Sequence, residues 1–294
     1  MKAIFLILFF SFPAFADLLS EAEYVVRTSG CADCHTAQES QPFAGGYKIM
    51  TPFGNFYSPN ITPDEETGIG KWNERDLKRA LRTGKSPSGR PYYPVFPYRS
   101  YTKMSDEDIH KIWIYLSSLE PIRKRNRDHY FLSWWRGQRE LLYTWNAFAF
   151  SNIGAGIRER IKSGGPGKMV KDPSKSERWN RGAYLAESML HCTECHTPRG
   201  YLLQIPQSDL WMAGTNDALN DTPIPNITPD PTTGITWSER EWDIFLSSGF
   251  SPKMKQPGHE MADVIRNTSN LTKEDRTALI EYLRSLQPVE HYSQ

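Results

Sequence analysis

Apolar side chains recur at helical spacing in two distant stretches of the chain, residues 105–119 and 272–286. Steps of three and four between apolar positions place them on one face of a helix, which predicts that each helix buries that face in a core. Ser105 and Thr272 open the stretches, each with an aspartate three places later, the pattern of a capping box. The apolar positions are Ile109, Ile112, Trp113 and Leu116 in the first stretch and Leu279, Tyr282, Leu283 and Leu286 in the second.

The same kind of pattern predicts two more pairs of helices. One pair covers Ser20 to Thr28 and Glu177 to Leu190, with Ser20 and Ser176 as N-caps. The other pair starts at Asn73 and at Ser238. In each copy, a long loop rich in proline and glycine lies before the helix that starts at Asn73 or Ser238, and we expect no regular element to persist in it.

The order of these patterns is duplicated along the chain. Pro59-Asn-Ile-Thr-Pro-Asp64 recurs as Pro225-Asn-Ile-Thr-Pro-Asp230, and the sequence Tyr-Leu-x-Ser-Leu ends both predicted last helices. The sequence therefore predicts an all-α chain made of a tandem repeat, with domains at 17–122 and 176–290. Residues 123–175 would form a linker that packs on the domains.

The first sixteen residues have the features of a secretory signal peptide. Lys2 gives a positive start, an apolar run from Ala3 to Phe12 follows, and Ala14-Phe15-Ala16 is a small-x-small cleavage site. The apolar run is too short to span a membrane, and no later stretch is apolar enough to do so. We therefore expect residues 1–16 to be removed on export to the periplasm and the remaining chain to carry no transmembrane segment.

Composition narrows the classes of partner. The formal net charge is +1, so no overall positive field indicates nucleic acid. Apolar residues make up 38% of the chain, and 20 glycines and 21 prolines make it rich in loops. Such a chain has difficulty burying a large core of its own, and a large apolar prosthetic group would help to fill the interior.

The four cysteines form two tight pairs, each completed by a histidine: Cys31-Ala-Asp-Cys34-His35 and Cys192-Thr-Glu-Cys195-His196. Cys-x-x-Cys-His is the attachment signature of c-type haem. The spacing places both sulfurs on one side of a helical turn, where each can bond one vinyl group of a porphyrin, and the next imidazole is the proximal ligand of the iron. We therefore predict two covalently attached haems held by Cys31, Cys34, Cys192 and Cys195, with His35 and His196 on the iron.

Two other chemistries use similar cysteine pairs. A redox dithiol normally follows a strand in a βαβ unit, a setting that this sequence does not suggest. A four-cysteine zinc site would leave both histidines unexplained and would have to join two separate repeats. The haem interpretation, with two class I cytochrome c-like domains that are rich in loops around the haems, accounts for all six residues.

Several segments resemble the cytochrome c subunits of periplasmic alcohol, gluconate and other sugar dehydrogenases. The resemblance rests on the stretches Tyr57 to Trp72, Leu77 to Arg82, Tyr93 to Tyr98 and His191 to Arg199, and it covers nearly all of the chain after residue 16. Those subunits typically carry three haems and often a C-terminal membrane attachment, so this chain is similar to their first two domains. The resemblance implies an electron-transfer role beside a dehydrogenase.

The resemblance also implies the sixth ligands of the irons. In the second domain, Gly258-His-Glu-Met-Ala-Asp-Val-Ile265 is similar to the family segment that supplies a methionine, which indicates Met261, with Met254 and His259 as less favoured alternatives. In the first domain Phe96 stands where many relatives have methionine, and other relatives place one eight residues later, here Met104. Met104 is therefore the predicted ligand, with an apolar contact at the N′ position of the last helix as its less favoured interpretation, and Met50 is an outside candidate.

Some side chains could serve either the haems or the fold. Trp72, Trp237, Arg82 and Arg199 could donate hydrogen bonds to haem propionates or could be ordinary packing and surface residues. The basic run Arg123-Lys-Arg-Asn-Arg127 is interpreted as a solvated linker, with a docking patch for an acidic partner as the alternative.

The leading functional prediction is a periplasmic electron-transfer protein. Electrons would enter from a dehydrogenase and leave to a downstream cytochrome or oxidase, with the haems supplying the redox chemistry. A dihaem redox enzyme such as a peroxidase is the alternative, and it requires one haem with an open sixth position. A structural subunit that anchors a catalytic partner is a third possibility.

Overall fold

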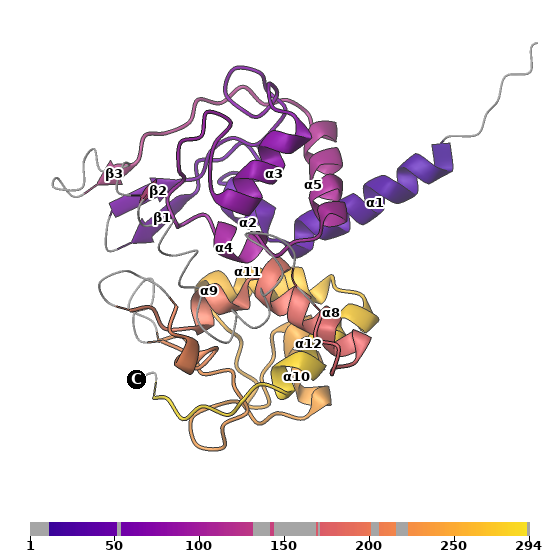
Figure 1. The fold of residues 1–294 in the computed structure, drawn as a ribbon, viewed down its shortest axis with the longest axis vertical. Helices are drawn as coiled ribbons and strands as arrows, with labels where there is room; N and C mark the ends of the chain where they lie inside the picture. Colours follow the sequence, from indigo (N-terminus) through magenta and orange to yellow (C-terminus); the bar gives the residue numbers. More distant parts are fainter. Residues whose placement is uncertain are drawn as a thin grey trace, which may run out of the picture.

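The computed structural model describes residues 12–51, 54–131, 142–143, 169, 171–200, 206–215 and 223–292. Most of the predicted signal peptide and most of the linker beyond residue 131 lie outside the described residues. Figure 1 shows two helical halves, with the N-terminal half drawn from indigo to magenta and the C-terminal half from salmon to yellow. The described part is mostly helical, as the apolar pattern predicts.

The first half contains α1 (Phe12–Thr28), α2 (Cys31–His35), β1 (Lys48–Thr51), β2 (Gly54–Tyr57), α3 (Glu74–Thr83), α4 (Tyr98–Tyr101), α5 (Asp106–Ser118) and β3 (Tyr130–Phe131). The second half contains α8 (Glu177–Tyr184), a π-helical turn η2 (Leu185–Met189), α9 (Cys192–His196), a 3-10 turn η3 (Ser208–Leu210), α10 (Glu239–Ser248), α11 (His259–Ser269) and α12 (Lys273–Arg284). The helices expected from Asn73, Ser105, Ser238 and Thr272 are all present.

The helix starts confirm some of the expected caps and correct others. Ser176 caps α8 by accepting from the Trp179 N–H, as expected. Ser20 is not an N-cap, because α1 begins eight residues earlier at Phe12 and Ser20 lies within it. The π-helical turn after Tyr184 was also not expected; it continues the predicted helix with a wider ring of hydrogen bonds.

The capping boxes predicted at Ser105 and Thr272 are only half formed. Both hydroxyls accept from the N–H of the aspartate three residues on. The aspartates do not reach back, however, because Asp108 accepts from the Tyr184 hydroxyl and Asp275 binds Arg181. Complete capping boxes occur instead at the starts of α3 and α10, where the caps are Asn73 and Ser238.

The loop after the first cysteine pair does contain regular structure, which corrects the all-α prediction. Strands β1 and β2 pair antiparallel, with Ile49 opposite Phe56, and β3 adds to the other edge of β2. The Phe56 ring is buried and lies against Tyr93 and His129. The sheet therefore fixes the chain that leaves the first half, because β3 belongs to the linker segment.

Each half is built on a pair of packed helices, α1 with α5 and α8 with α12. In the second pair, a Cβ on Gly182 would lie 1.9 Å from the carbonyl oxygen of Ala278, so the absence of a side chain allows α8 and α12 to touch. Most of the predicted apolar faces are buried, with Ile109, Ile112, Leu116, Leu279, Tyr282 and Leu283 all nearly inaccessible. Trp113 and Leu286 are only half-buried and pack against the core.

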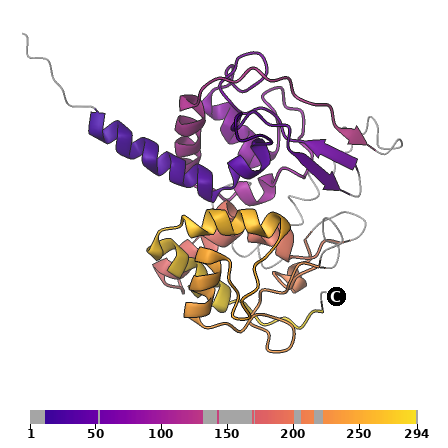
Figure 2. The ribbon, with the colours of Figure 1, turned by 180° about the vertical axis from the view of Figure 1, so that it is seen from behind.

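The two halves meet along α2 and α4 on one side and α9, η2 and α11 on the other (Figures 1 and 2). The Lys103 ammonium lies 3.2 Å from a carboxylate oxygen of Glu187, and both side chains are less than a tenth exposed. The Tyr282 hydroxyl donates to the other Glu187 oxygen. Tyr24 of α1 reaches Asp275 of α12 with a 2.6 Å hydrogen bond. The contact between the halves is therefore partly polar and well buried.

The described part of the linker lies back on the first half. Lys124 donates to the Gly45 carbonyl at 2.9 Å, the Arg127 guanidinium lies 4.2 Å from the centre of the Tyr57 ring, and Arg123 pairs with Glu66. The basic run is thus engaged with the first half and is not a fully solvated linker. Within the described ranges, no helix is both long and apolar enough to cross a membrane.

Candidate haem-attachment sites

The two cysteine pairs occupy short helices of the same length in the two halves. Both α2 and α9 contain five residues and follow a residue in the left-handed conformation, Gly30 with φ 66° and His191 with φ 43°. Glycine adopts this conformation freely, whereas histidine is strained in it. The His191 ring makes an edge contact with Tyr101 of the other half, at 5.6 Å between ring centres. The strained position thus places an aromatic contact between the halves.

The histidine of each motif is held by a proline carbonyl. His35 Nδ1 lies 2.7 Å from the Pro59 oxygen, and His196 Nδ1 lies 2.8 Å from the Pro225 oxygen. Because a carbonyl oxygen only accepts, Nδ1 carries the proton and Nε2 keeps its lone pair. Burial lowers the pKa of both imidazoles, which keeps them neutral. This is the arrangement that a haem iron requires of its proximal ligand.

The repeated Pro-Asn-Ile-Thr-Pro-Asp segment explains how those carbonyls are positioned. The buried amide of Asn60 donates to the Ile122 carbonyl at 2.7 Å, and its oxygen accepts from the Thr62 N–H at 2.9 Å. Asn226 makes the matching bonds, to the Val289 carbonyl at 2.7 Å and from the Thr228 N–H at 2.9 Å. Sequence reasoning found this repeat but not its role, which is to tie the histidine-holding loop to the chain that follows the last helix.

A second matched contact closes the loop under each histidine. The Gly45 N–H donates to the His35 carbonyl at 2.7 Å, and the Gly214 N–H donates to the His196 carbonyl at 2.8 Å. A Cβ on Gly45 would lie 2.4 Å from the Pro59 carbonyl oxygen, and Gly45 has φ 68°. Glycine is therefore required where this loop crosses the segment that holds the histidine.

The cysteine side chains are not suited to a redox dithiol. None of the four forms a disulfide. Burial raises the pKa of the half-buried Cys31 and Cys192 to about 12, whereas Cys34 and Cys195 are exposed. Reactive dithiols have lowered thiol pKa values because the thiolate is the nucleophile. Across the described residues, which include all four cysteines, no cluster of three or more His, Cys, Asp or Glu side chains is arranged to hold a metal ion.

The predicted sixth ligands lie in different surroundings. Met104 is fully buried directly before Ser105, the N-cap of α5, and it belongs to the apolar core, as does Ile109. Met261 is the third residue of α11 and is half-buried. Met104 thus occupies the N′ position that the staple interpretation also requires, and both methionines remain predictions as ligands.

The other candidates are placed as follows. Met254 is 74% exposed and Met50 is 49% exposed, so both are surface residues. Phe96 packs partly buried against Tyr98 and Tyr101. The side chain of His259 lies outside the described residues.

The arginines proposed for propionates differ in how they are engaged. Arg82 is buried and donates to the Thr102 carbonyl and to Asp106, so its role is in the fold. Arg199 pairs with Glu194, the acidic residue inside the second motif. Burial alone would raise the pKa of Glu194, but Arg199, Arg99 and Ser100 outweigh it and lower that pKa to about 2.

Buried donors with no partner indicate where a carboxylate-bearing group would fit. Among the described side chains, the buried polar atoms without a hydrogen-bond partner are Arg99 Nε and Nη1, Trp242 Nε1 and the hydroxyls of Ser29, Thr102 and Ser188. Unsatisfied buried donors are costly, and a guanidinium or indole N–H suits a carboxylate. A haem carries two propionates, so these donors and the histidine geometry fit such a group. Sequence reasoning missed Arg99 and Trp242 because neither stands in a motif.

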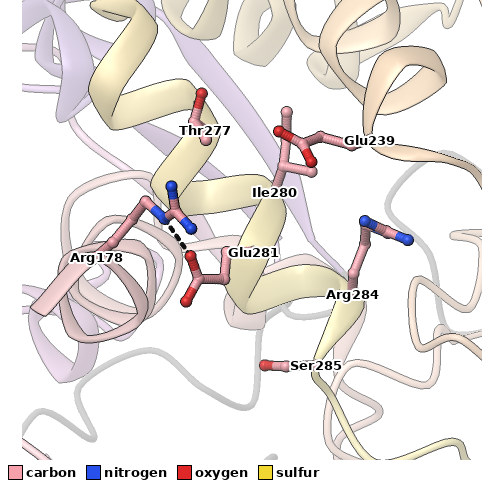
Figure 3. Close-up of a pocket in the computed structure, with 7 residues that line it drawn as sticks. All are labelled: Arg178, Glu239, Thr277, Ile280, Glu281, Arg284 and Ser285. Carbon is pink, nitrogen blue, oxygen red and sulfur yellow. Dashed lines mark hydrogen bonds and ion pairs between the residues drawn. The ribbon is translucent and has the colours of Figure 1, made fainter. Parts of the chain in front are cut away.

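A pocket on the second half lies apart from both motifs. Figure 3 shows it between α8, α10 and α12, lined by Arg178, Glu239, Thr277, Ile280, Glu281, Arg284 and Ser285, with Arg178 paired to Glu281. Its lining contains no cysteine, histidine or methionine. It therefore offers none of the ligands that a haem requires.

The chain is similar to several known cytochromes. No family model matches it. It is 38% identical over 284 residues to a dihaem c-type cytochrome of Cereibacter sphaeroides, an alignment that covers 94% of this chain and 89% of that protein. It is 34% identical over 272 residues to the cytochrome subunit of the fructose dehydrogenase of Gluconobacter japonicus, covering 91% of this chain and 52% of that protein.

A third relative is the cytochrome c subunit of the quinone-type alcohol dehydrogenase of Gluconobacter oxydans, 34% identical over 280 residues. This chain contributes 92% of its own length to that alignment and spans 55% of the relative. The Cereibacter protein is matched along most of its length, and the two cysteine pairs with their held histidines are the features that a cytochrome c uses. The chain belongs to the family of dihaem c-type cytochromes.

Proposed function

We propose that this protein is a periplasmic electron-transfer cytochrome with two covalently attached haems, one in each of two tandem class I cytochrome c domains, 17–122 and 176–290. The observation that carries the proposal is the pair of matched proximal sites. In each, a histidine next to two cysteines has its Nδ1 held by a proline carbonyl, at 2.7 Å and 2.8 Å, and its Nε2 left for iron. The haem supplies one-electron redox chemistry when it is bound.

Each residue has a defined part in this proposal. Cys31, Cys34, Cys192 and Cys195 would hold the porphyrins through thioether bonds, formed when a thiol adds across a vinyl group without an oxidant. His35 and His196 would be the proximal ligands. Met104 and Met261 would be the sixth ligands, since a thioether is a soft ligand that favours a stable low-spin iron and a raised potential.

The partner classes follow from the relatives. Several are cytochrome subunits of dehydrogenases, among them alcohol, fructose and gluconate dehydrogenases. A periplasmic dehydrogenase would therefore donate electrons to this chain, and a downstream cytochrome or oxidase would accept them. Export through residues 1–16 would bring the chain to the compartment of that dehydrogenase.

Optical and EPR spectra of the holoprotein test the proposal. We expect two haems per chain and two low-spin His/Met signals, one lost in Met104→Ala and the other in Met261→Ala. Met254→Ala is the matched control, because that methionine lies on the surface, and both signals should remain. The haem count is measured independently from the absorbance of the denatured protein in pyridine.

A high-spin haem in the unmutated protein would contradict this function. It would mean that one iron has an open position, which favours the alternative of a dihaem peroxidase. Intact signals in both methionine variants would show that other residues bind the irons.

A further inference from the structure

The segment after α10 has an unusual surface. We call residues 249–258 the Met254 loop. Met254 is 74% exposed, Phe250 is 38% exposed, and Ile244, one turn before the end of α10, is 42% exposed. These three exposed side chains are close in sequence, and Met254 is the most exposed of them, so the loop around it is a candidate contact surface.

The backbone of this loop matches a loop of the first half. The Ser251 N–H donates to the Lys255 carbonyl at 3.0 Å, and the Met254 N–H donates to the Ser251 carbonyl at 2.8 Å. In the first half, Ser86 bonds Arg90 and Gly89 bonds Ser86 in the same pattern, both at 2.8 Å. Met254 therefore stands where the other half has Gly89.

The methionine is strained at this position. Met254 has φ 57° and Gly89 has φ 81°, and the left-handed conformation costs a residue with a Cβ about 1 kcal/mol more than glycine. The fold recovers little of that cost by packing, since three quarters of the side chain is in solvent. A residue that the fold does not need, at a site where glycine would be better, indicates a use outside the fold.

The first half shows what this turn can bind. The Tyr143 hydroxyl donates to the Gly89 carbonyl at 3.3 Å, and the Lys85 ammonium lies 6.0 Å from the centre of the Tyr143 ring. A segment from elsewhere in the chain thus lies over the turn and contributes an aromatic ring. The equivalent turn of the second half instead presents its tip side chain to solvent.

The Met254 loop carries positive charge, which favours a partner with a negatively charged surface. Lys253 and Lys255 flank Met254, both are exposed, and no aspartate or glutamate occurs between 249 and 258. The loop leads directly into α11, which carries Met261, and Gly249 lies beside Ile265 of that helix. A protein bound here would be next to the segment that we assign to the second iron.

We infer that the Met254 loop is the docking surface for an acidic redox protein, which packs an apolar or aromatic side chain on Met254 while its carboxylates face Lys253 and Lys255. The inference rests on the proposed function because electron transfer is the reason for docking. The binding itself can be measured without electron flow. Complementary charge would act mainly on the rate of encounter and the apolar centre on the lifetime of the complex.

The test uses the holoprotein and isotope-labelled plant plastocyanin, an acidic copper protein, as the probe. NMR shift titrations at low salt give the dissociation constant, and stopped-flow mixing gives the rate of electron transfer. In Lys253→Glu/Lys255→Glu we expect binding at least tenfold weaker. The control Lys48→Glu/Arg90→Glu makes the same change in net charge on the first half and should weaken binding less than threefold.

Met254→Gly separates docking from damage to the fold. Glycine relieves the strained backbone, so this variant should unfold at a higher temperature than the unmutated protein, yet bind the probe three- to tenfold more weakly. Equal weakening in both charge variants, or unchanged binding in Met254→Gly, would overturn the inference. Normal binding without electron transfer to plastocyanin or to ferricyanide would instead refute the proposed function and leave the docking surface supported.

Discussion

The segments around the cysteine motifs, here called proximal, are alike in the two halves. The segments that carry Met104 and Met261, here called distal, differ between the halves. On the proximal side, the cysteine helix, the held histidine and the asparagine tie are repeated almost bond for bond. On the distal side, the first half has the four-residue helix α4 and a fully buried Met104, whereas the second half has the eleven-residue helix α11 and a half-buried Met261. The two halves therefore share the hydrogen bonds around the cysteine motifs and differ in the segments that carry Met104 and Met261.

The distal segments also contribute to the contact between the halves. Lys103, next to Met104, is buried against Glu187 of the second half. On α11, the Asn267 amide donates to Asp33 inside the first cysteine motif at 2.5 Å. Each distal segment thus contacts a different partner in the opposite half, which accounts for the difference between the two segments.

Removing the ion pair between Lys103 and Glu187 should have the largest effect on stability. Lys103→Met leaves the Glu187 carboxylate buried without its cation, so we expect a loss of about 4 kcal/mol in the free energy of unfolding. Chemical denaturation of the holoprotein measures this loss. The low-spin signal assigned to Met104 should broaden or weaken as well, because its segment loses its anchor.

The double variant Lys103→Met/Glu187→Met is the control. Removing both charges should recover most of the lost stability. A loss below about 1 kcal/mol in the single variant would show that the pair does not hold the halves together.

The two asparagines test whether the proximal segments of the two halves contribute equally to stability. Asn60→Ala and Asn226→Ala each remove a buried amide. Each leaves an N–H without its acceptor and a carbonyl with only a long contact, of 3.4 Å or 3.5 Å, from a threonine hydroxyl. We expect each to cost about 3 kcal/mol, and the two costs to be similar. Unfolding monitored separately at each haem would measure them, and costs that differ by more than twofold would contradict the symmetry.

The smallest expected effect concerns pH. Burial alone would raise the pKa of Asp275, but hydrogen bonds from Arg181 and Tyr24 outweigh it and lower that pKa below its ordinary value of 3.8. The stabilisation is then complete above about pH 4 and is lost as the pH falls through the lower folded value. Asp275→Asn should cost about 2 kcal/mol at pH 7 and progressively less in acid.

Thermal unfolding of Asp275→Asn and of the unmutated protein between pH 7 and pH 2 measures this difference. Glu274→Gln is the control, because Glu274 is exposed on the same helix and its loss should leave the profile unchanged. A stability difference that does not shrink in acid would refute the assignment.

Local pattern was enough to predict most helices. The helix starts at Asn73 and Ser238 and the buried face of Ile109 and Leu116 are encoded within a few residues. The cysteine-histidine spacing is equally local, and the two haem sites that it indicates stay a prediction. The predictions that failed involve partners far apart in the sequence. The Asp108 carboxylate accepts from Tyr184 of the other half instead of completing a capping box, and β2 pairs with β3 of the linker segment. No local window contains those partners.

The asparagine tie links each histidine to the chain that follows the last helix. Asn60 holds the carbonyl of Ile122, the neighbouring Pro59 carbonyl holds His35, and the chain after Ile122 stays on the first half through Lys124 and β3. A pull on the segment that connects the halves would therefore load β3 and the Lys124 contact first and would reach the imidazole only after these had detached. In mechanical terms, residues 123–131 shield the His35 ring from movement between the halves.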